Sequence, residues 1–298
     1  MLKVREKEAW SKIHDSIKND LEKDDKKYIR RVVRLLRECL GETAAGYIKK
    51  RYSTYFLWDV VLRKYLPVRT GYKALEVGSA PGENLLRFHR MFGYAPYGVE
   101  YSKIGAELNK ELFLSHNIDA RNVICSDFFS DEFQAKYREY FNIVSSFGFI
   151  EHFSNVEEVI DKHLNLLAPR GTLVVAIPNF RGINYWLMRF FKKENIDSHN
   201  LIIMKKHSFK KLFSNRQLST LYCDYAGTFN FFEFFNPSMG KIKQYLQRCG
   251  SLFQLFLNLC FNLTLRKRGI ETPFTSPFLI YIGQKADASG STIRSGRF

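Results

Sequence analysis

The sequence predicts an α/β protein whose mostly parallel, seven-stranded sheet is covered by helices on both faces. Short apolar runs alternate with helical stretches from residue 73 onward, which is typical of right-handed strand–helix–strand units. Of the 298 residues, 45% are hydrophobic, so the chain can bury a sizeable core. We therefore expect one large domain with helical additions.

The first 70 residues are interpreted as an N-terminal helical cap. Over residues 5–66, apolar side chains recur at helical spacing among charges, as in the stripe that contains Trp58, Val61 and Leu62. Pro67 and Gly71 then end the pattern. We expect this segment to pack on the domain that follows it.

The sheet is predicted to begin after the cap. Five apolar runs are expected to form buried strands: KALEV (73–77), APYGVE (95–100), NVICS (122–126), FNIVSSF (141–147) and TLVVAIP (172–178). Helices are expected between them, over 83–92, 103–117, 130–140 and 156–167.

Two helical inserts are predicted before the last strands. The inserts cover about 181–215 and about 236–275, and the strands are expected around 222–232 and at PFLIYIGQ (277–284). We assign 71–286 to the main domain and expect residues 287–298 to form a disordered tail.

The net charge of +16 is carried by the two ends of the chain. Residues 1–70 hold 18 Lys and Arg against 10 Asp and Glu, and residues 236–298 hold 9 against 2. The remaining 165 residues are almost neutral, with 19 against 18. The basic flanks could bind RNA, a membrane surface or a protein, but they are not the predicted central site.

The cysteines argue against a disulfide framework and a zinc site. There are five of them, they are scattered, and they form no C-x-x-C pair. The start, MLKVREKEAW, lacks the apolar core of a signal peptide. We expect a cytoplasmic protein without a metal site.

The stretch ALEVGSAPGENLLR (74–87) predicts a strand, a glycine-rich turn and a helix. Gly78 and Gly82 permit a tight turn, but Ala80 stands where a G-x-G-x-x-G dinucleotide fingerprint has its second glycine. Pro81 has no N–H to offer a phosphate. The turn therefore predicts a ligand that approaches the backbone closely and carries no diphosphate.

Glu76 defines the charge of that ligand. A phosphate about 4 Å from its carboxylate would be opposed by roughly 4 kcal/mol at an effective dielectric of 20. A cationic ligand would be favoured instead. An adenosine with a positively charged amino-acid end and no phosphate meets both conditions, and S-adenosylmethionine is such a molecule.

These segments resemble the motifs of class I S-adenosylmethionine-dependent methyltransferases, which have a Rossmann-like fold. LEVGSAPG (75–82) resembles the first motif, and GTLVVAIPNF (171–180) resembles the fifth strand. NIVSSFGFIEHF (142–153) resembles the fourth strand and its turn, which in the type 11 branch often ends in Glu-His. The resemblance covers roughly residues 70–180 and the last strand.

The resemblance implies a set of cofactor-binding residues. Glu100, 18 residues after Gly82, would bind the ribose hydroxyls. Asp127 would bind the adenine amino group, and Phe128 would pack on the ring. The full set is Glu76, Gly78, Ser79, Ala80, Gly82, Glu100, Tyr101, Asp127, Phe128, Ser146 and Phe147.

Candidate catalytic and acceptor-binding residues follow the fourth and fifth strands. His152 is the candidate base or acceptor-positioning group, and Glu151 would orient it; the alternative is that both only support the loop. Arg181, Asn184 and His199 lie in the first insert and are candidates for acceptor contact, although this insert could equally be the apolar underside of a lid.

The segment SLFQLFLNLCFNLTL (251–265) has two interpretations. Gln254, Asn258 and Asn262 form one polar stripe, and basic residues flank the segment. It is too short to span a membrane. It is either a helix buried against the sheet or a partner subunit, or a helix that lies in a membrane interface.

Three functions remain open from the sequence. The first is methyl transfer from S-adenosylmethionine to a small molecule, such as a hydrophobic, lipid-linked or sugar-precursor acceptor. The second is methylation of RNA with the help of the basic flanks. The third is a cofactor-binding or scaffold protein without turnover. The first is favoured, with peripheral membrane contact as an additional expectation and the oligomeric state open.

Overall fold

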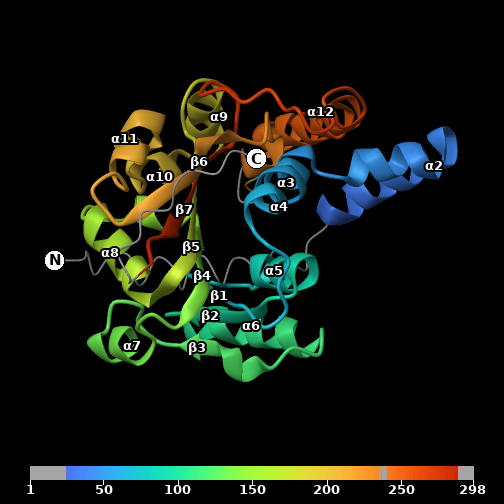
Figure 1. The fold of residues 1–298 in the computed structure, drawn as a ribbon. Coiled ribbons are helices and arrows are strands. Elements are labelled where there is room, and N and C mark those ends of the chain that lie inside the picture. The colour runs from blue at the N-terminus through green and yellow to red at the C-terminus, as the bar shows by residue number, and fades with distance from the viewer. Residues whose placement is uncertain (1–24, 235, 237–239, 288–298) are drawn as a thin grey trace.

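The computed structural model describes residues 25–234, 236 and 240–287, and its centre is a seven-stranded sheet with the order β3-β2-β1-β4-β5-β7-β6 (Figure 1). The strands are β1 (Lys73–Val77), β2 (Ala95–Glu100), β3 (Val123–Cys125), β4 (Phe141–Phe147), β5 (Leu167–Pro178), β6 (Leu218–Ala226) and β7 (Phe278–Lys285). The first five strands are parallel, and β7 pairs antiparallel with both β5 and β6. The predicted α/β fold class is confirmed.

Most helices lie where the apolar periodicity predicted them. The main ones are α2 (Asp25–Lys49), α5 (Glu83–Phe92), α6 (Lys103–Leu114), α7 (Asp131–Lys136), α8 (Val156–Leu166), α9 (Ile183–Phe191), α10 (Lys193–Asp197), α11 (Lys206–Lys211) and α12 (Lys241–Thr264). The predicted parts of the cap over residues 1–24 and of the tail over 288–298 lie outside the described residues.

Two strand boundaries differ from the expectation. β6 was expected around 222–232, but it begins at Leu218 and ends at Ala226. It ends there because Gly227 and Thr228 both have positive φ angles, which a strand does not accommodate. β5 begins at Leu167, five residues before the predicted run, and its pairing with β4 is irregular between Phe141 and Ile143.

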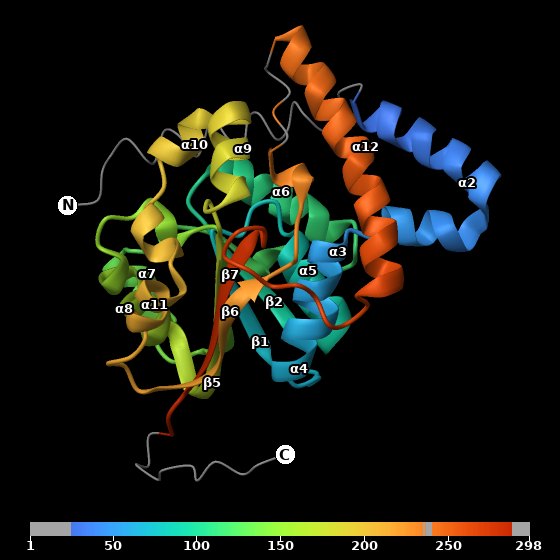
Figure 2. The same cartoon turned by 90° about the horizontal axis from the view of Figure 1, so that it is seen from above.

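Apolar cores lie on both faces of the sheet, as a central parallel sheet requires. One core joins inward side chains of β4 and β5 to α7, α8 and α11, with Phe133, Ile160 and Phe209 among its members. The other joins the opposite side chains to α5, α6 and the cap, with Trp58, Phe88 and Phe113 among its members. The two layers of helices are visible on either side of the sheet in Figure 2.

Over its described residues, the cap consists of two helical runs. α2 kinks at Gly41 (φ 81°), and the chain leaves helical geometry at Arg51. A second run then joins α3 (Tyr52–Tyr55), a π-helical segment (Phe56–Leu62) and α4 (Arg63–Tyr65) without a break. This second run packs on the sheet domain, where Trp58 contacts Phe88 with ring centroids 4.9 Å apart. The cap therefore belongs to the same core as α5.

The helix α12 packs through its polar stripe. Asn258 accepts a hydrogen bond from the backbone N–H of Tyr52 and donates one to the carbonyl oxygen of Ile48. Asn262 donates to the carbonyl oxygens of Tyr47 and Lys50. These amides pair backbone groups at the end of α2, where helical hydrogen bonds run out. Figure 2 shows the two helices side by side.

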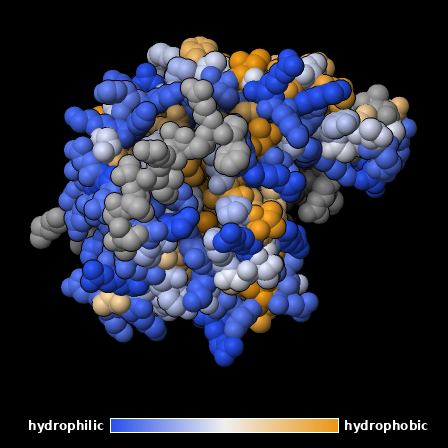
Figure 3. Space-filling view, in the orientation of Figure 1, coloured by the Kyte–Doolittle hydropathy of each residue, from blue (hydrophilic) through white to orange (hydrophobic). Residues whose placement is uncertain are grey.

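The opposite face of α12 is apolar and exposed. Phe253 and Phe256 are 55% and 58% exposed, and Ile242, Tyr245, Leu246 and Leu263 are also exposed. Hydrophobic side chains show along the top of the molecule, where α12 lies (Figure 3). The helix packs on α2 and α3 of its own chain through its polar stripe and neighbouring side chains such as Leu255 and Phe261. The interpretation as a helix in a membrane interface stays a prediction. Among the described residues we find no helix long and apolar enough to span a bilayer.

We predict that Asn258→Leu lowers the free energy of unfolding by about 1–3 kcal/mol, because it leaves the backbone groups of Tyr52 and Ile48 buried without partners. Urea unfolding measures this change. The matched control is Asn215→Leu, at an exposed turn position, which should change stability by less than about 0.5 kcal/mol. Equal stability of the two variants would contradict the anchoring role of the stripe.

Candidate functional site

The glycine-rich turn lies at the edge where parallel strands end. β1 ends at Val77, and the N–H groups of Gly78 and Ser79 donate to the carbonyl oxygen of Val99 on neighbouring β2. β1 lies between β2 and β4, so the strand order reverses at this point. In doubly wound sheets ligands bind in the crevice outside such a switch point. The turn is therefore placed as a ligand site requires.

Two glycines in the turn are required by its geometry. Gly82 has φ 99°, and a Cβ there would lie 2.2 Å from Oδ1 of Asn109. Gly78 has φ 70°, and a Cβ there would lie 2.9 Å from the ring of Phe149. Asn109 also donates to Oγ of Ser79 at 2.8 Å, which ties the turn to α6. The peptide bond between Ala80 and Pro81 is cis.

Glu76 is a buried carboxyl group with one unsatisfied oxygen. Its side chain is 3% exposed, and Oε1 accepts a hydrogen bond of 2.8 Å from Nδ2 of Asn84. Oε2 has no partner among the described residues. Burial raises the pKa of Glu76 to about 8, and the nearby charge of Glu100 adds to the rise. A cation beside Oε2 would offset both effects.

Glu100 ends β2 and turns back toward the glycine-rich turn. It is buried, and its carboxylate accepts from the N–H of Ser102 at 2.8 Å and from that of Ala80 at 3.4 Å. Carboxylate oxygens have about four lone-pair sites in all, so these bonds leave acceptor capacity for hydroxyl groups. The next residue, Tyr101, is exposed.

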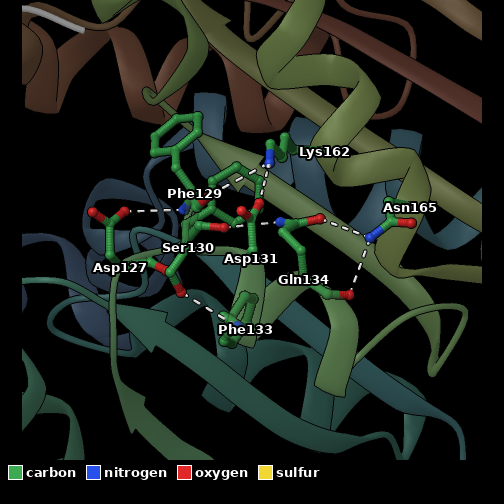
Figure 4. A network of polar contacts seen from close by, with 9 residues as sticks. Asp127, Phe129, Ser130, Asp131, Phe133, Gln134, Lys162 and Asn165 are labelled. Carbon is green, nitrogen blue, oxygen red and sulfur yellow. Dashed lines mark hydrogen bonds and ion pairs between the residues drawn. The ribbon is translucent and has the colours of Figure 1, made fainter.

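Asp127 begins a polar network that orders the loop after β3 (Figure 4). Its Oδ1 accepts from the N–H of Phe129 at 2.9 Å, while Ser130 caps α7 through the N–H of Phe133. The loop is therefore held in one conformation. Phe128 is buried in the core against His163, with ring centroids 4.9 Å apart, so its predicted adenine-stacking face is packed against protein.

A cavity of about 880 Å³ opens beyond the end of β4. Its walls come from the cap, the start of α5, the ends of β4 and β5, and the first insert. Glu151, His152, Asn184 and His199 line it, and Phe147 does so from β4, stacked on Trp58. Asn84 lines this cavity and also donates to Glu76, so the cavity adjoins the buried carboxyl of β1.

Some predicted residues lie outside this cavity. The turn residues 78–82, Glu100 and Asp127 are not among its lining residues, and neither are Ser146, which is fully buried, and Arg181. Asn184 lines the wall, but its amide donates to the carbonyl oxygens of Thr275 and Ser276, so it also fixes the insert to the chain before β7.

Sequence patterns did not reveal the contribution of the cap. Lys50, Arg51 and Trp58 line the cavity although the cap was interpreted only as packing. Lys192 lines it from the first insert, and Glu233 does so from the short turn Phe231–Phe234 after β6. The one available signal was the run of three bases at residues 49–51, where the helical pattern breaks. Phe149, whose ring lies against Gly78, was also missed.

The Glu-His pair after β4 meets a histidine of the insert. Glu151 is 1% exposed, and its Oε1 lies 3.9 Å from Nε2 of His152. The rings of His152 and His199 have centroids 4.3 Å apart. Burial raises the pKa of Glu151 to about 8 and lowers that of His152. Burial, and then the charge of His152, lowers the pKa of His199 to about 3.

Comparison with known proteins identifies the protein family to which this chain belongs. A family model described as a methyltransferase domain matches residues 26–222, which is more than half of the chain. The chain therefore belongs to the methyltransferase domain family. It is an S-adenosylmethionine-dependent methyltransferase, as its resemblance to class I enzymes implied, and S-adenosylmethionine is its cofactor.

Solved structures of similar fold include two methyltransferases. A putative sarcosine dimethylglycine methyltransferase from Galdieria sulphuraria has a TM-score of 0.50 and 12% identity, with 80% of this chain and 86% of that chain covered. Phosphoethanolamine N-methyltransferase 2 from Haemonchus contortus, solved with S-adenosylhomocysteine, has a TM-score of 0.50 and 14% identity, with 83% of this chain and 57% of that chain covered. At this identity the likeness establishes the fold. A search of curated proteins found no match.

We predict that Glu76→Gln changes how stability depends on pH. With a pKa of about 8 in the folded state and about 4.3 in the unfolded state, Glu76 binds more protons when folded. The wild type should therefore lose stability relative to Glu76→Gln as the pH rises between these values. Urea unfolding from about pH 5 to about pH 9 measures this slope.

The matched control is Glu107→Gln, an exposed carboxylate on α6. It should leave the pH dependence of the wild type unchanged. A stability difference between wild type and Glu76→Gln that stays constant over the whole pH range would show that the carboxyl group of Glu76 does not titrate differently on folding.

Proposed function

We propose that this methyltransferase acts on a small-molecule acceptor with an apolar body and an anionic or oxygen-rich end. The observation that supports this proposal is the cavity of about 880 Å³ beside Glu76. This volume lies in the range of pockets that bind small ligands. The cap and the first insert wall it, which favours an acceptor that enters the cavity over one that lies across a surface.

The lining of the cavity supports the chemistry of this acceptor. Apolar side chains, most of them aromatic, form one part of the wall: Leu57, Trp58, Phe147, Phe180, Phe234 and Phe278. Charged side chains of both signs lie in the rest of the wall, and among them Lys50, Arg51 and Lys192 are cations that could contact an anionic or oxygen-rich end of the acceptor. Apolar walls with a few convergent charges are typical of pockets that hold amphipathic ligands.

We propose that S-adenosylmethionine binds along the ends of β1, β2 and β3. The unpartnered Oε2 of Glu76 suits the ammonium group of the cofactor, and the tight turn between Gly78 and Gly82 lies beside it at the end of β1. Glu100 would accept hydrogen bonds from the ribose hydroxyls, and Asp127 would accept one from the adenine amino group. Ser79, Ala80, Tyr101, Ser146 and Phe147 would complete the surroundings, whereas Phe128 would support the loop from the core.

Methyl transfer requires the acceptor atom to lie in line with the S–CH₃ bond, and positioning supplies most of the rate. We propose that His152, Glu151 and His199 position the acceptor at the wall of the cavity. Burial lowers the pKa of both histidines, so both are neutral and can accept a hydrogen bond from an acceptor hydroxyl or amine.

We predict that Glu100→Ala weakens binding of S-adenosylhomocysteine at least about tenfold, because two hydroxyl groups lose a charged acceptor. Isothermal titration calorimetry measures this, and Glu107→Ala on the exposed face of α6 is the matched control.

Transfer of labelled methyl groups from S-adenosylmethionine into small-molecule and lipid fractions of a cell extract tests the acceptor class, with Glu100→Ala as the inactive control. Label found in RNA alone would overturn the proposal of a small-molecule acceptor. In the calorimetric experiment, unchanged affinity of Glu100→Ala for S-adenosylhomocysteine would remove the assignment of Glu100 to the ribose.

We also propose that α12 contacts a membrane peripherally, which would suit a lipid-like acceptor. Its exposed apolar face carries Phe253 and Phe256, and the basic residues 266–268 follow its end. An apolar helix face with nearby cations is suited to the interface of an anionic bilayer. Because α12 packs on the cap through the polar stripe of its other face, this apolar face is exposed to solvent.

We predict that the wild type floats with vesicles of phosphatidylcholine and phosphatidylserine, and that Phe253→Glu with Phe256→Glu abolishes flotation because two apolar contacts become charged. The matched control is Leu114→Glu, an exposed leucine at the end of α6, which should float like the wild type. If the wild type stays in solution with these vesicles, membrane contact by α12 is excluded.

A further inference from the structure

Three side chains with metal-ligating atoms meet at one wall of the cavity. Glu151 and His152 follow β4, and His199 comes from the first insert after α10. One carboxylate oxygen and one nitrogen of each imidazole all lie within 4.8 Å of one another. All three residues line the cavity. The fold therefore brings His199 to two adjacent residues, Glu151 and His152, that lie more than 45 residues before it in the sequence.

The carboxylate of Glu151 is a second, independent observation. The residue is 1% exposed, and neither of its oxygens has a hydrogen-bond partner among the described residues. The 3.9 Å to Nε2 of His152 is too long for a hydrogen bond. A buried carboxyl group without partners is costly, and native structures rarely keep one unless a ligand, an ion or water satisfies it.

The three residues are held by contacts typical of the surroundings of a metal site. The backbone N–H of Asn200 donates to the carbonyl oxygen of Glu151 at 2.7 Å, which fixes the insert beside the turn after β4. Nδ1 of His152 lies 3.4 Å from the carbonyl oxygen of Ser198, and Nδ1 of His199 lies 3.1 Å from Oγ of Ser198. Imidazole ligands commonly bond an oxygen through one nitrogen and the metal through the other.

We propose that Glu151, His152 and His199 bind one divalent transition-metal ion, such as Zn²⁺, at the wall of the acceptor cavity. Two imidazoles and one carboxylate are a known ligand set for ions that keep open positions. The cysteine pattern, which predicted no metal site, carries no information about a site of this composition.

The metal site refines the acceptor class, and this step rests on the proposed function. An open position at the cavity wall would bind an acceptor oxygen, such as a hydroxyl group, and would lower its pKa. The hydroxyl proton would leave to water, and an oxygen lone pair would form the bond to the methyl carbon. The electron pair of the C–S bond would stay on sulfur, giving S-adenosylhomocysteine. The acceptor would then be an oxygen nucleophile.

The test is direct metal binding by the full chain, without cofactor or acceptor. Protein freed of metal by a chelator is titrated with Zn²⁺ in a calorimeter, and bound zinc is quantified after gel filtration. We expect one equivalent in the wild type. Glu151→Gln and His199→Ala should each weaken binding at least about tenfold, because each removes a ligand. Co²⁺ absorption would report the loss of a nitrogen ligand in His199→Ala.

The matched control is His207→Ala, an exposed histidine on α11 in the same insert, which should bind like the wild type. Retained S-adenosylhomocysteine binding shows that each variant is folded, and Glu100→Ala should still bind the metal. The proposal is overturned if the wild type binds no Zn²⁺ or Mn²⁺, or if Glu151→Gln and His199→Ala both bind with unchanged affinity. A failed acceptor search leaves this result unaffected, so the two proposals fail separately.

Discussion

The structure depends on the burial of two carboxyl groups at the ends of neighbouring parallel strands. Glu76 lies in β1 and Glu151 lies just after β4, and the two strands pair directly. Burial raises the pKa of each to about 8. Removing a carboxylate from water is favourable only when a cation or several donors compensate it. The free protein holds two such groups where the strand order reverses, so this edge of the sheet is suited to positively charged ligands.

The two carboxyl groups serve different sides of the reaction in our proposals. Glu76 faces the glycine-rich turn, where the ammonium group of S-adenosylmethionine would satisfy its free oxygen. Glu151 faces the cavity, where a metal ion would bind one of its oxygens. Asn84 links the two sides, because it bonds Glu76 and lines the cavity. One constraint, the desolvation of carboxylates, thus organises both the cofactor side and the acceptor side.

The cap and α12 show a second use of buried polar groups. Asn258 and Asn262 donate three hydrogen bonds to backbone carbonyl oxygens, and Asn258 accepts one from a backbone N–H, where α2 ends and α3 begins. These bonds hold the basic residues Lys50 and Arg51 at the cavity. They also turn the apolar face of α12 outward. A helix normally buries its apolar stripe. In α12 the polar stripe is buried on the cap and the apolar stripe is exposed, and this exposed stripe is the surface that we propose contacts a membrane.

The sequence by itself determined the order of the strands along the chain, the position of the turn and the class of cofactor. These depend on local features: apolar runs, Gly78 and Gly82 in a turn, and an acid two residues before it. Tertiary structure alone decided which residues share a wall, because His199 and Arg51 reach the cavity through packing between segments far apart in the chain. It also decided which face of α12 is buried, since the local periodicity shows the polar stripe that contains Asn258 but not the backbone groups of another helix with which it pairs.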